Sequence, residues 1–140
     1  MPNRFLIMLE ISIEQLPLYS SVFEFEINQK LVDGFQKSFR TSSRQIPPTL
    51  GVRALTCMFE LLNRLEVDWM KLLHVQQDFE YLDSLHLPCQ VRSQAILERY
   101  RKRATSHWLN FTTNIYEVSS NNLLLRSHST ILIAETGGAE

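Results

Sequence analysis

Two consecutive prolines, Pro47 and Pro48, followed by Thr49, constrain the fold of this chain more than any other feature. Proline cannot continue a helix from upstream, and it disfavours helical backbone in the residue before it. Thr49 is a suitable N-cap, because its hydroxyl can accept a hydrogen bond from the first free backbone N–H groups. The sequence therefore predicts a helix that starts here and runs to about Leu65.

The predicted helix is apolar around most of its circumference. Its polar side chains fall on one narrow stripe at helical spacing: Arg53, Thr56, Glu60, Asn63 and Arg64. A helix on a protein surface keeps a wider polar face. We therefore expect this helix to be enclosed, with Met58, Leu61 and Leu62 buried.

Alternating apolar and polar residues predict strands on both sides of this helix. One strand precedes it at 22–27 and leads into a shorter helix with Leu31, Phe35 and Phe39 on one face. The helix is followed by long strands at 72–82, 91–101, 107–118 and 123–133. This order predicts an α+β fold in which one antiparallel sheet wraps around a central helix.

The alternation also predicts how the side chains of the strand at 72–82 divide between its two faces. Leu73, Val75, Phe79 and Tyr81 share one face with Gln77. His74 and Asp78 fall on the opposite, more polar face. Tight connections are expected at 101–106 and 119–122.

The two cysteines, Cys57 and Cys89, provide neither metal-ligand spacing nor a disulfide framework. Cys57 lies on the predicted helix and is expected to pack as a small hydrophobic residue. Cys89 falls in the turn region predicted at 83–90 and is a candidate free thiol. We expect no metal site and no cofactor.

The length of 140 residues suits one domain spanning 1–140, with an undefined segment at 1–21 and a loose tail at 136–140. The net charge of −1 gives no reason to expect binding to nucleic acid. No apolar run is long enough to span a bilayer, and the short run at 5–9 is a poor signal peptide. We therefore expect a cytoplasmic protein without membrane contact.

Four stretches resemble motifs of the MaoC-like hot-dog dehydratases, in the N-terminal, type-I-fatty-acid-synthase-like branch. They are Ile46–Leu50, Leu73–Tyr81, Glu98–Arg103 and Ser129–Ile133. They occur in the order and spacing of that family and cover most of the chain. The resemblance implies the hot-dog fold, an acyl thioester of coenzyme A or acyl carrier protein as ligand, and a homodimer or heterodimer.

The chain departs from the family pattern at two places. Pro88-Cys89-Gln90 stands where family members usually have Pro-Gly-Asp. Catalytic MaoC-like chains also carry an Asp and a His in the loop before the central helix, but 40–49 contains no Asp, Glu or His. The resemblance therefore implies the non-catalytic, acyl-chain-binding half of a heterodimeric (3R)-hydroxyacyl-thioester dehydratase or enoyl-thioester hydratase, with a MaoC-like catalytic partner.

The start of the helix is the expected substrate-binding site, formed by Pro48, Thr49, Leu50 and Gly51. The first backbone N–H groups of a helix are free and favour negative charge, so they suit the enolate oxygen of a reacting thioester.

Glu60 and His74 are the candidate catalytic groups within the chain. Glu60 has Arg64 four residues later, which favours a paired polar stripe instead. His74 has Asp78 four residues later, but that spacing on a strand exceeds hydrogen-bond reach. A sheet histidine on the polar face is therefore the favoured interpretation.

The basic cluster Arg99, Arg101, Lys102 and Arg103 is a candidate docking site for the carrier, either acidic groups of acyl carrier protein or coenzyme A phosphates. A solvated hairpin tip is the simpler explanation. Two other functions stay open for the whole chain: a binding or scaffold protein without turnover, and an active thioesterase or dehydratase that uses Glu60 or His74.

Overall fold

The computed structural model describes residues 13–30, 49–83 and 87–134, with the backbone alone at 13 and 49–54. The predicted helix through Leu31, Phe35 and Phe39 lies outside these residues. So do the loop at 40–48, residues 1–12 of the N-terminal segment and the C-terminal tail at 136–140.

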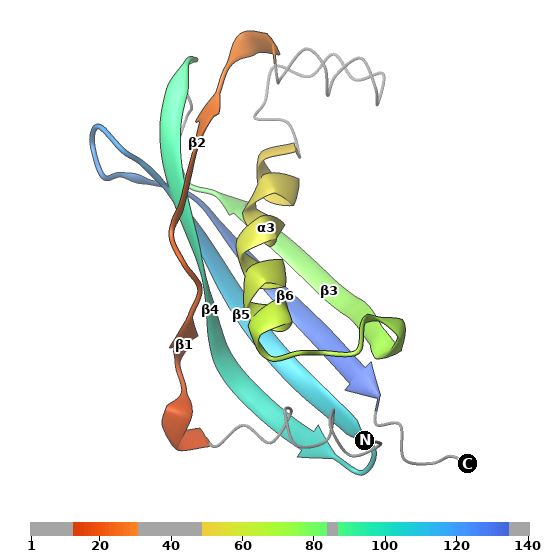
Figure 1. Cartoon of the computed structure of the whole chain (residues 1–140). Helices are drawn as coiled ribbons and strands as arrows, with labels where there is room; N and C mark the ends of the chain where they lie inside the picture. Colours follow the sequence, from red (N-terminus) through yellow and green to blue (C-terminus); the bar gives the residue numbers. More distant parts are fainter. Residues whose placement is uncertain (1–12, 31–48, 84–86, 135–140) are drawn as a thin grey trace.

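In the described residues, antiparallel strands form one twisted sheet that curves around the long helix α3 (Thr49–Arg64) (Figure 1). The strand order is β1-β4-β5-β6-β3, and β2 also pairs with β4. The strands are β1 (Leu18–Tyr19), β2 (Phe23–Ile27), β3 (Leu72–Tyr81), β4 (Cys89–Arg103), β5 (Ser106–Glu117) and β6 (Leu123–Ala134). The four long strands match those expected from the alternation of apolar residues.

The helix α3 (Thr49–Arg64) lies on one face of the sheet, mainly over β4 and β5. Met58, Leu61 and Leu62 are 0%, 2% and 0% exposed, so the predicted burial of this helix is confirmed. They pack on side chains from the inner face of the sheet: Ala95, Leu97, Leu109, Phe111, Ile131 and Ile133. The narrow polar stripe is thus the part of α3 that core packing leaves free.

A second apolar cluster closes the other end of the sheet. It consists of Ile27, Cys89, Val91, Ile115, Leu124 and Leu125. The short strands β1 and β2 both pair with β4 and are separated by one break. At the break the Ser20 hydroxyl accepts a hydrogen bond from the Ala95 N–H at 2.8 Å, and the Ser20 N–H donates to the Ala95 carbonyl at 2.8 Å. The serine therefore satisfies backbone groups that a continuous strand would pair.

A bulge in β3 overturns the predicted facing of its first half. The register with β6 shifts between His74 and Gln76, so His74 lies opposite the inward-facing Ile131. Leu73 and Val75 are instead 59% and 45% exposed. One extra residue exchanges the two faces of a strand, because side chains alternate with a period of two.

The turn before β4 is shorter than predicted. Cys89 is the first residue of β4 and is 4% exposed, so its placement in a surface loop was wrong. The tight turns of the two later hairpins occur where they were expected. Their positive φ values fall at Ala104 (51°) and at Asn121 (61°), and asparagine tolerates that conformation well.

One helix enclosed on one side by a long antiparallel sheet is the hot-dog architecture expected from the sequence. Two short 3₁₀ turns, η1 (Ile13–Gln15) and η2 (Trp69–Lys71), complete the described elements. None of the described helices has the length and apolar content needed to cross a membrane.

The packing of α3 on the sheet gives a direct stability test. Replacing Leu62 with Ala should lower the free energy of unfolding by about 2–5 kcal/mol, because it leaves a cavity in a closed core. The neighbouring exposed substitution Asn63→Ala should change it by less than about 0.5 kcal/mol. Urea unfolding measures both values, and similar losses for the two variants would contradict a core centred on this helix.

Candidate functional site

The start of α3 is the first part of the candidate site. Thr49, Leu50 and Gly51 are its first three residues, so the expected helix boundary is confirmed. The first backbone N–H groups of a helix have no acceptor within the helix, so they suit an anionic oxygen. Pro48 lies outside the described residues. The binding role of all four residues stays a prediction.

Glu60 joins α3 to the segment between β1 and β2. Its Oε1 accepts a hydrogen bond from the Ser21 N–H at 2.7 Å, and its Oε2 accepts one from Arg64 Nε at 2.6 Å. Arg64 in turn donates through Nη2 to the Tyr19 carbonyl. The ion pair expected at this spacing is therefore present, and it also holds the N-terminal strands against the helix.

These contacts determine the protonation behaviour of Glu60. Burial raises the pKa of this carboxyl, but the hydrogen bonds from Ser21 and Arg64 outweigh burial, so the pKa is lowered from its ordinary value. A carboxylate with a lowered pKa and both oxygens engaged is a weak general base. The contacts favour a structural role for Glu60.

His74 lies on the α3 side of β3 because of the bulge. Its Nε2 is 3.0 Å from Gln77 Oε1, and the Ser129 hydroxyl donates to the same oxygen at 2.5 Å. Asp78 lies on the opposite face and accepts a hydrogen bond from Gln76 Nε2 at 2.8 Å. The structure therefore gives His74 an amide partner and no carboxylate among the described residues, which disfavours its activation as a base.

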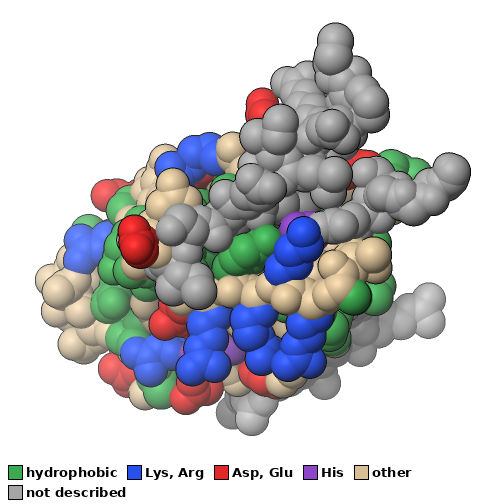
Figure 2. Space-filling view, turned by 90° about the horizontal axis from the view of Figure 1, so that it is seen from below, with side chains coloured by type: hydrophobic (Ala, Val, Ile, Leu, Met, Phe, Trp, Pro, Cys, Tyr) green, Lys and Arg blue, Asp and Glu red, His purple; other side chains and the backbone are tan. Residues whose placement is uncertain are grey.

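The predicted basic cluster is divided by a second bulge, between Leu97 and Arg99 in β4. Viewed from the end of the molecule where the β4–β5 turn lies, Lys and Arg side chains gather on one part of the surface (Figure 2). The alternation after the bulge puts Arg99 and Arg101 on the outer face of the sheet and Lys102 on the α3 side. Arg103 ends β4 at the turn.

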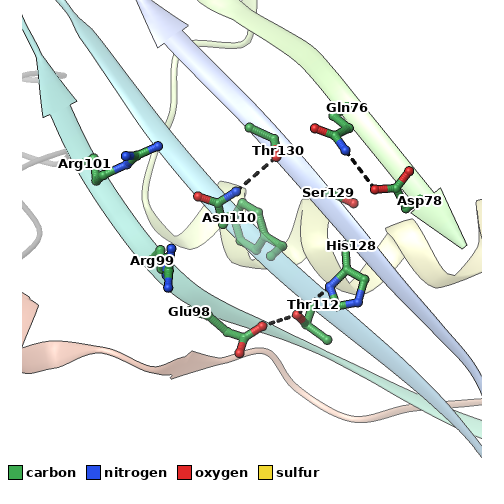
Figure 3. Close-up of a pocket in the computed structure, with 11 residues that line it drawn as sticks. Gln76, Asp78, Glu98, Arg99, Arg101, Asn110, Thr112, His128, Ser129 and Thr130 are labelled. Carbon is green, nitrogen blue, oxygen red and sulfur yellow. Dashed lines mark hydrogen bonds between the residues drawn. The ribbon is translucent and has the colours of Figure 1, made fainter. Parts of the chain in front are cut away.

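Arg99 and Arg101 line an open hollow of about 370 Å³ on the outer face of the sheet, with α3 behind it (Figure 3). Its other polar side chains come from all four long strands: Gln76, Asp78, Glu98, Asn110, Thr112, His128 and Thr130. This volume is at the lower end of the range of roughly 300–1,000 Å³ for small-molecule sites.

Hydrogen bonds join the strands beneath the hollow. Thr112 Oγ1 donates to Glu98 Oε1 and lies 3.2 Å from His128 Nδ1. His128 Nε2 is 3.1 Å from Glu80 Oε1, and because a carboxylate only accepts, this nitrogen carries the proton in that contact. A chain of four side chains therefore fixes the floor from β4 to β3.

Sequence analysis missed this hollow, although its signal is visible in the strands. Polar residues occupy alternate outward positions of β5 and β6, where Asn110 and Thr112 lie opposite Thr130 and His128. Asn110 Nδ2 donates to Thr130 Oγ1 at 3.0 Å.

Neither cysteine offers a reactive thiol in the described chain. Cys57 is fully buried with its Sγ 3.0 Å from the Ser93 hydroxyl, and burial raises its pKa. Burial, together with the neighbouring Glu117 carboxylate, raises the pKa of Cys89 to about 11. Cys57 therefore packs as expected, and within the described residues no group of three or more His, Cys, Asp and Glu could hold a metal ion.

Comparison with known proteins identifies the fold. No family model and no curated protein matches the sequence. Among solved structures, the truncated HadBC (3R-hydroxyacyl-ACP dehydratase) complex of Mycobacterium tuberculosis is similar with a TM-score of 0.68 and 8% identity, over 83% of this chain and 95% of that one. A MaoC-like dehydratase from Rhodospirillum rubrum is similar with a TM-score of 0.61 and 8% identity, over 89% of this chain and 97% of that chain. HtdX of M. tuberculosis is similar with a TM-score of 0.66 and 15% identity, over 84% of this chain and 51% of that chain.

These likenesses define the class of protein. The chain has the hot-dog fold, in the form found in MaoC-like dehydratases and in HadBC. The resemblance expected from the sequence motifs is confirmed at this level. At these low identities, the comparison assigns no catalytic or binding role to any residue of this chain.

Substitution of Glu60 tests how much its contacts with Ser21 and Arg64 stabilise the fold. Its lowered pKa means that the ionised carboxylate stabilises the fold near neutral pH, and that this contribution is lost as pH falls through the lowered folded-state pKa. We expect Glu60→Gln to be less stable than the unmodified chain by about 1 kcal/mol at pH 7. The difference should fade in acid.

Urea unfolding over a pH series measures this difference. Glu24→Gln, at an exposed carboxylate on β2, is the matched control and should stay close to the unmodified chain at every pH. A loss in Glu60→Gln that persists undiminished at acid pH would show that packing, not charge, accounts for its effect.

Proposed function

We propose that this chain is a subunit of a (3R)-hydroxyacyl-thioester dehydratase or enoyl-thioester hydratase, and that it is the non-catalytic, acyl-chain-binding half of a heterodimer. The observation that carries the proposal is a fold shared with 3R-hydroxyacyl-ACP dehydratase subunits, combined with a loop at 40–49 that has no Asp, Glu or His.

The chemistry explains why such a loop matters. Dehydration of a 3-hydroxyacyl thioester needs a base for the α-proton, an acid for the departing hydroxyl and donors for the enolate oxygen. The N–H groups at the start of α3, near Leu50 and Gly51, are suitable donors. Glu60 and His74 are engaged as described above, so a partner chain with an Asp and a His would supply the proton transfers.

An edge of the sheet is the surface that we propose for this partner. Among the described strands β3 pairs only with β6, so its other edge is open. Large apolar side chains are exposed on and just before this edge: Trp69, Met70, Leu73, Val75, Tyr81 and Leu82. Open strand edges are liabilities that pairing removes. A second hot-dog chain bound there would extend the sheet and cover these side chains.

The carrier of the acyl group is coenzyme A or acyl carrier protein, and the exposed cations Arg99, Arg101, Lys102 and Arg103 are its candidate docking residues. They lie among the last five residues of β4, on two faces of the sheet. Acidic groups of a carrier protein or phosphates of coenzyme A would be attracted to them.

Activity is the first test of the proposal. The purified chain alone should hydrate 2-enoyl thioesters at least about a hundredfold more slowly than the chain mixed with an Asp/His-bearing MaoC-like partner, because a positioned acid or base contributes 10²–10⁴-fold. Absorbance of the enoyl thioester follows the reaction. An ordinary enzymatic rate from the chain alone would refute the non-catalytic role, and Glu60→Gln and His74→Ala would then identify the responsible group.

Assembly is the second test. Val75→Lys adds a charge at the open edge of β3, and edge lysines oppose strand pairing. We expect dimers of the unmodified chain, or its complex with the partner, to become monomers in sedimentation velocity at micromolar concentration. Val22→Lys is the matched control, because Val22 is 53% exposed and lies next to β2. A monomeric unmodified chain with and without partner, or equal dissociation of both variants, would contradict edge pairing.

A further inference from the structure

The hollow on the outer face of the sheet has a polar lining that the docking role proposed for Arg99 and Arg101 leaves unexplained. Two guanidinium groups, Arg99 and Arg101, lie at its β4 side (Figure 3). Within the described part of the chain, neither makes a hydrogen bond or ion pair. Arginines in a hollow with no protein acceptor are open to an anionic ligand, especially a phosphate or a carboxylate.

The nearby carboxylates do not neutralise these arginines. Glu98 accepts a hydrogen bond from Thr112, and Asp78 accepts one from Gln76 on the far strand. Asp78 is three strands away from β4, which corresponds to about 14 Å at the usual spacing between strands. The β4 side of the hollow therefore carries two guanidinium groups without an ion-pair partner among the described residues, next to the carboxylate of Glu98, and further hydrogen-bond acceptors lie at the other side.

The side chains between these ends are neutral and polar. Asn110 and Thr130 form one hydrogen-bonded pair in the middle of the hollow, and Gln76 extends from β3. Amide and carboxylate oxygens such as those of Asn110, Gln76 and Asp78 accept hydrogen bonds from hydroxyl groups. Most of the lining surface is polar, which does not suit an acyl chain.

We propose that this hollow binds a small phosphate ester that carries hydroxyl groups, such as a sugar phosphate. The phosphate lies against Arg99 and Arg101, and the hydroxyls donate to Asn110, Gln76 and Asp78. All of these residues belong to one chain, and they lie on the sheet face opposite α3.

Two observations favour this ligand over an acidic segment of a protein. The arginines are accompanied in the same hollow by Asp78 and Glu98, which would repel the further carboxylates of such a segment. The hollow is also small, at about 370 Å³, and its floor is fixed by hydrogen bonds across four strands. A compact ligand with one anionic end fits both features.

Calorimetric titration of the full chain at low ionic strength tests the proposal, with ribose 5-phosphate and inorganic phosphate as probes. Ribose 5-phosphate should bind more tightly than inorganic phosphate. Arg99→Gln and Arg101→Gln should each lower the affinity for both probes by at least about tenfold, because charge-assisted hydrogen bonds are lost. Asp78→Asn should lower the affinity for ribose 5-phosphate by about fivefold, because a neutral hydrogen bond replaces a charged one. The affinity for inorganic phosphate should stay the same.

Arg126→Gln is the matched control, because it removes the same charge from the outer face of β6 outside the hollow. It should change both affinities less than twofold. An equal loss in this variant would show diffuse attraction instead of a site and overturn the proposal. No binding of either probe, equal affinity for both, or displacement of the sugar phosphate by an Asp/Glu-rich peptide at lower concentration would overturn it too.

The measurement needs no turnover and no partner chain, so it is independent of the proposed dehydratase role. An inactive heterodimer whose subunit still binds ribose 5-phosphate would refute the dehydratase proposal alone. An active heterodimer without this binding would refute the outer-face site alone.

Discussion

Packing of α3 against the sheet is the interaction on which the rest of the structure depends. Met58, Leu61 and Leu62 enter the concave inner face formed mainly by β4 and β5. The clamp of Glu60 and Arg64 then attaches the N-terminal strands to the same helix. Because one helix covers mainly these strands, the β3 side of the sheet keeps exposed apolar side chains and an open edge.

The sequence was sufficient to predict the fold because the two main periodicities are undisturbed over most of the chain. The prolines before Thr49 mark the start of the helix, and the strict alternation in β5 and β6 marks the inner face. These patterns reflect burial, which is the largest favourable term in folding. Three of the motifs that resembled MaoC-like dehydratases lie on β3, β4 and β6.

The site was less predictable, since it depends on single-residue shifts that leave no periodic signal. The bulge beside Val75 turns His74 toward α3, and the bulge after Leu97 divides the basic cluster between two faces. A bulge needs one extra residue and no characteristic side chain, so alternation alone cannot locate it. The hollow combines outward positions of four strands, and only the register brings Arg101 and Asp78 to the same surface.

The two faces of the sheet differ in whether one chain alone can form the site that we propose there. On the α3 side, the dehydratase function that we propose needs a second chain, because 40–49 contains no Asp, Glu or His and the edge of β3 is unpaired among the described strands. On the outer face, hydrogen bonds from Glu98 through Thr112 and His128 fix a polar floor within one chain. An interface at β3 can therefore form or dissociate without removing a side chain from the outer hollow, which makes the two properties separable by mutation.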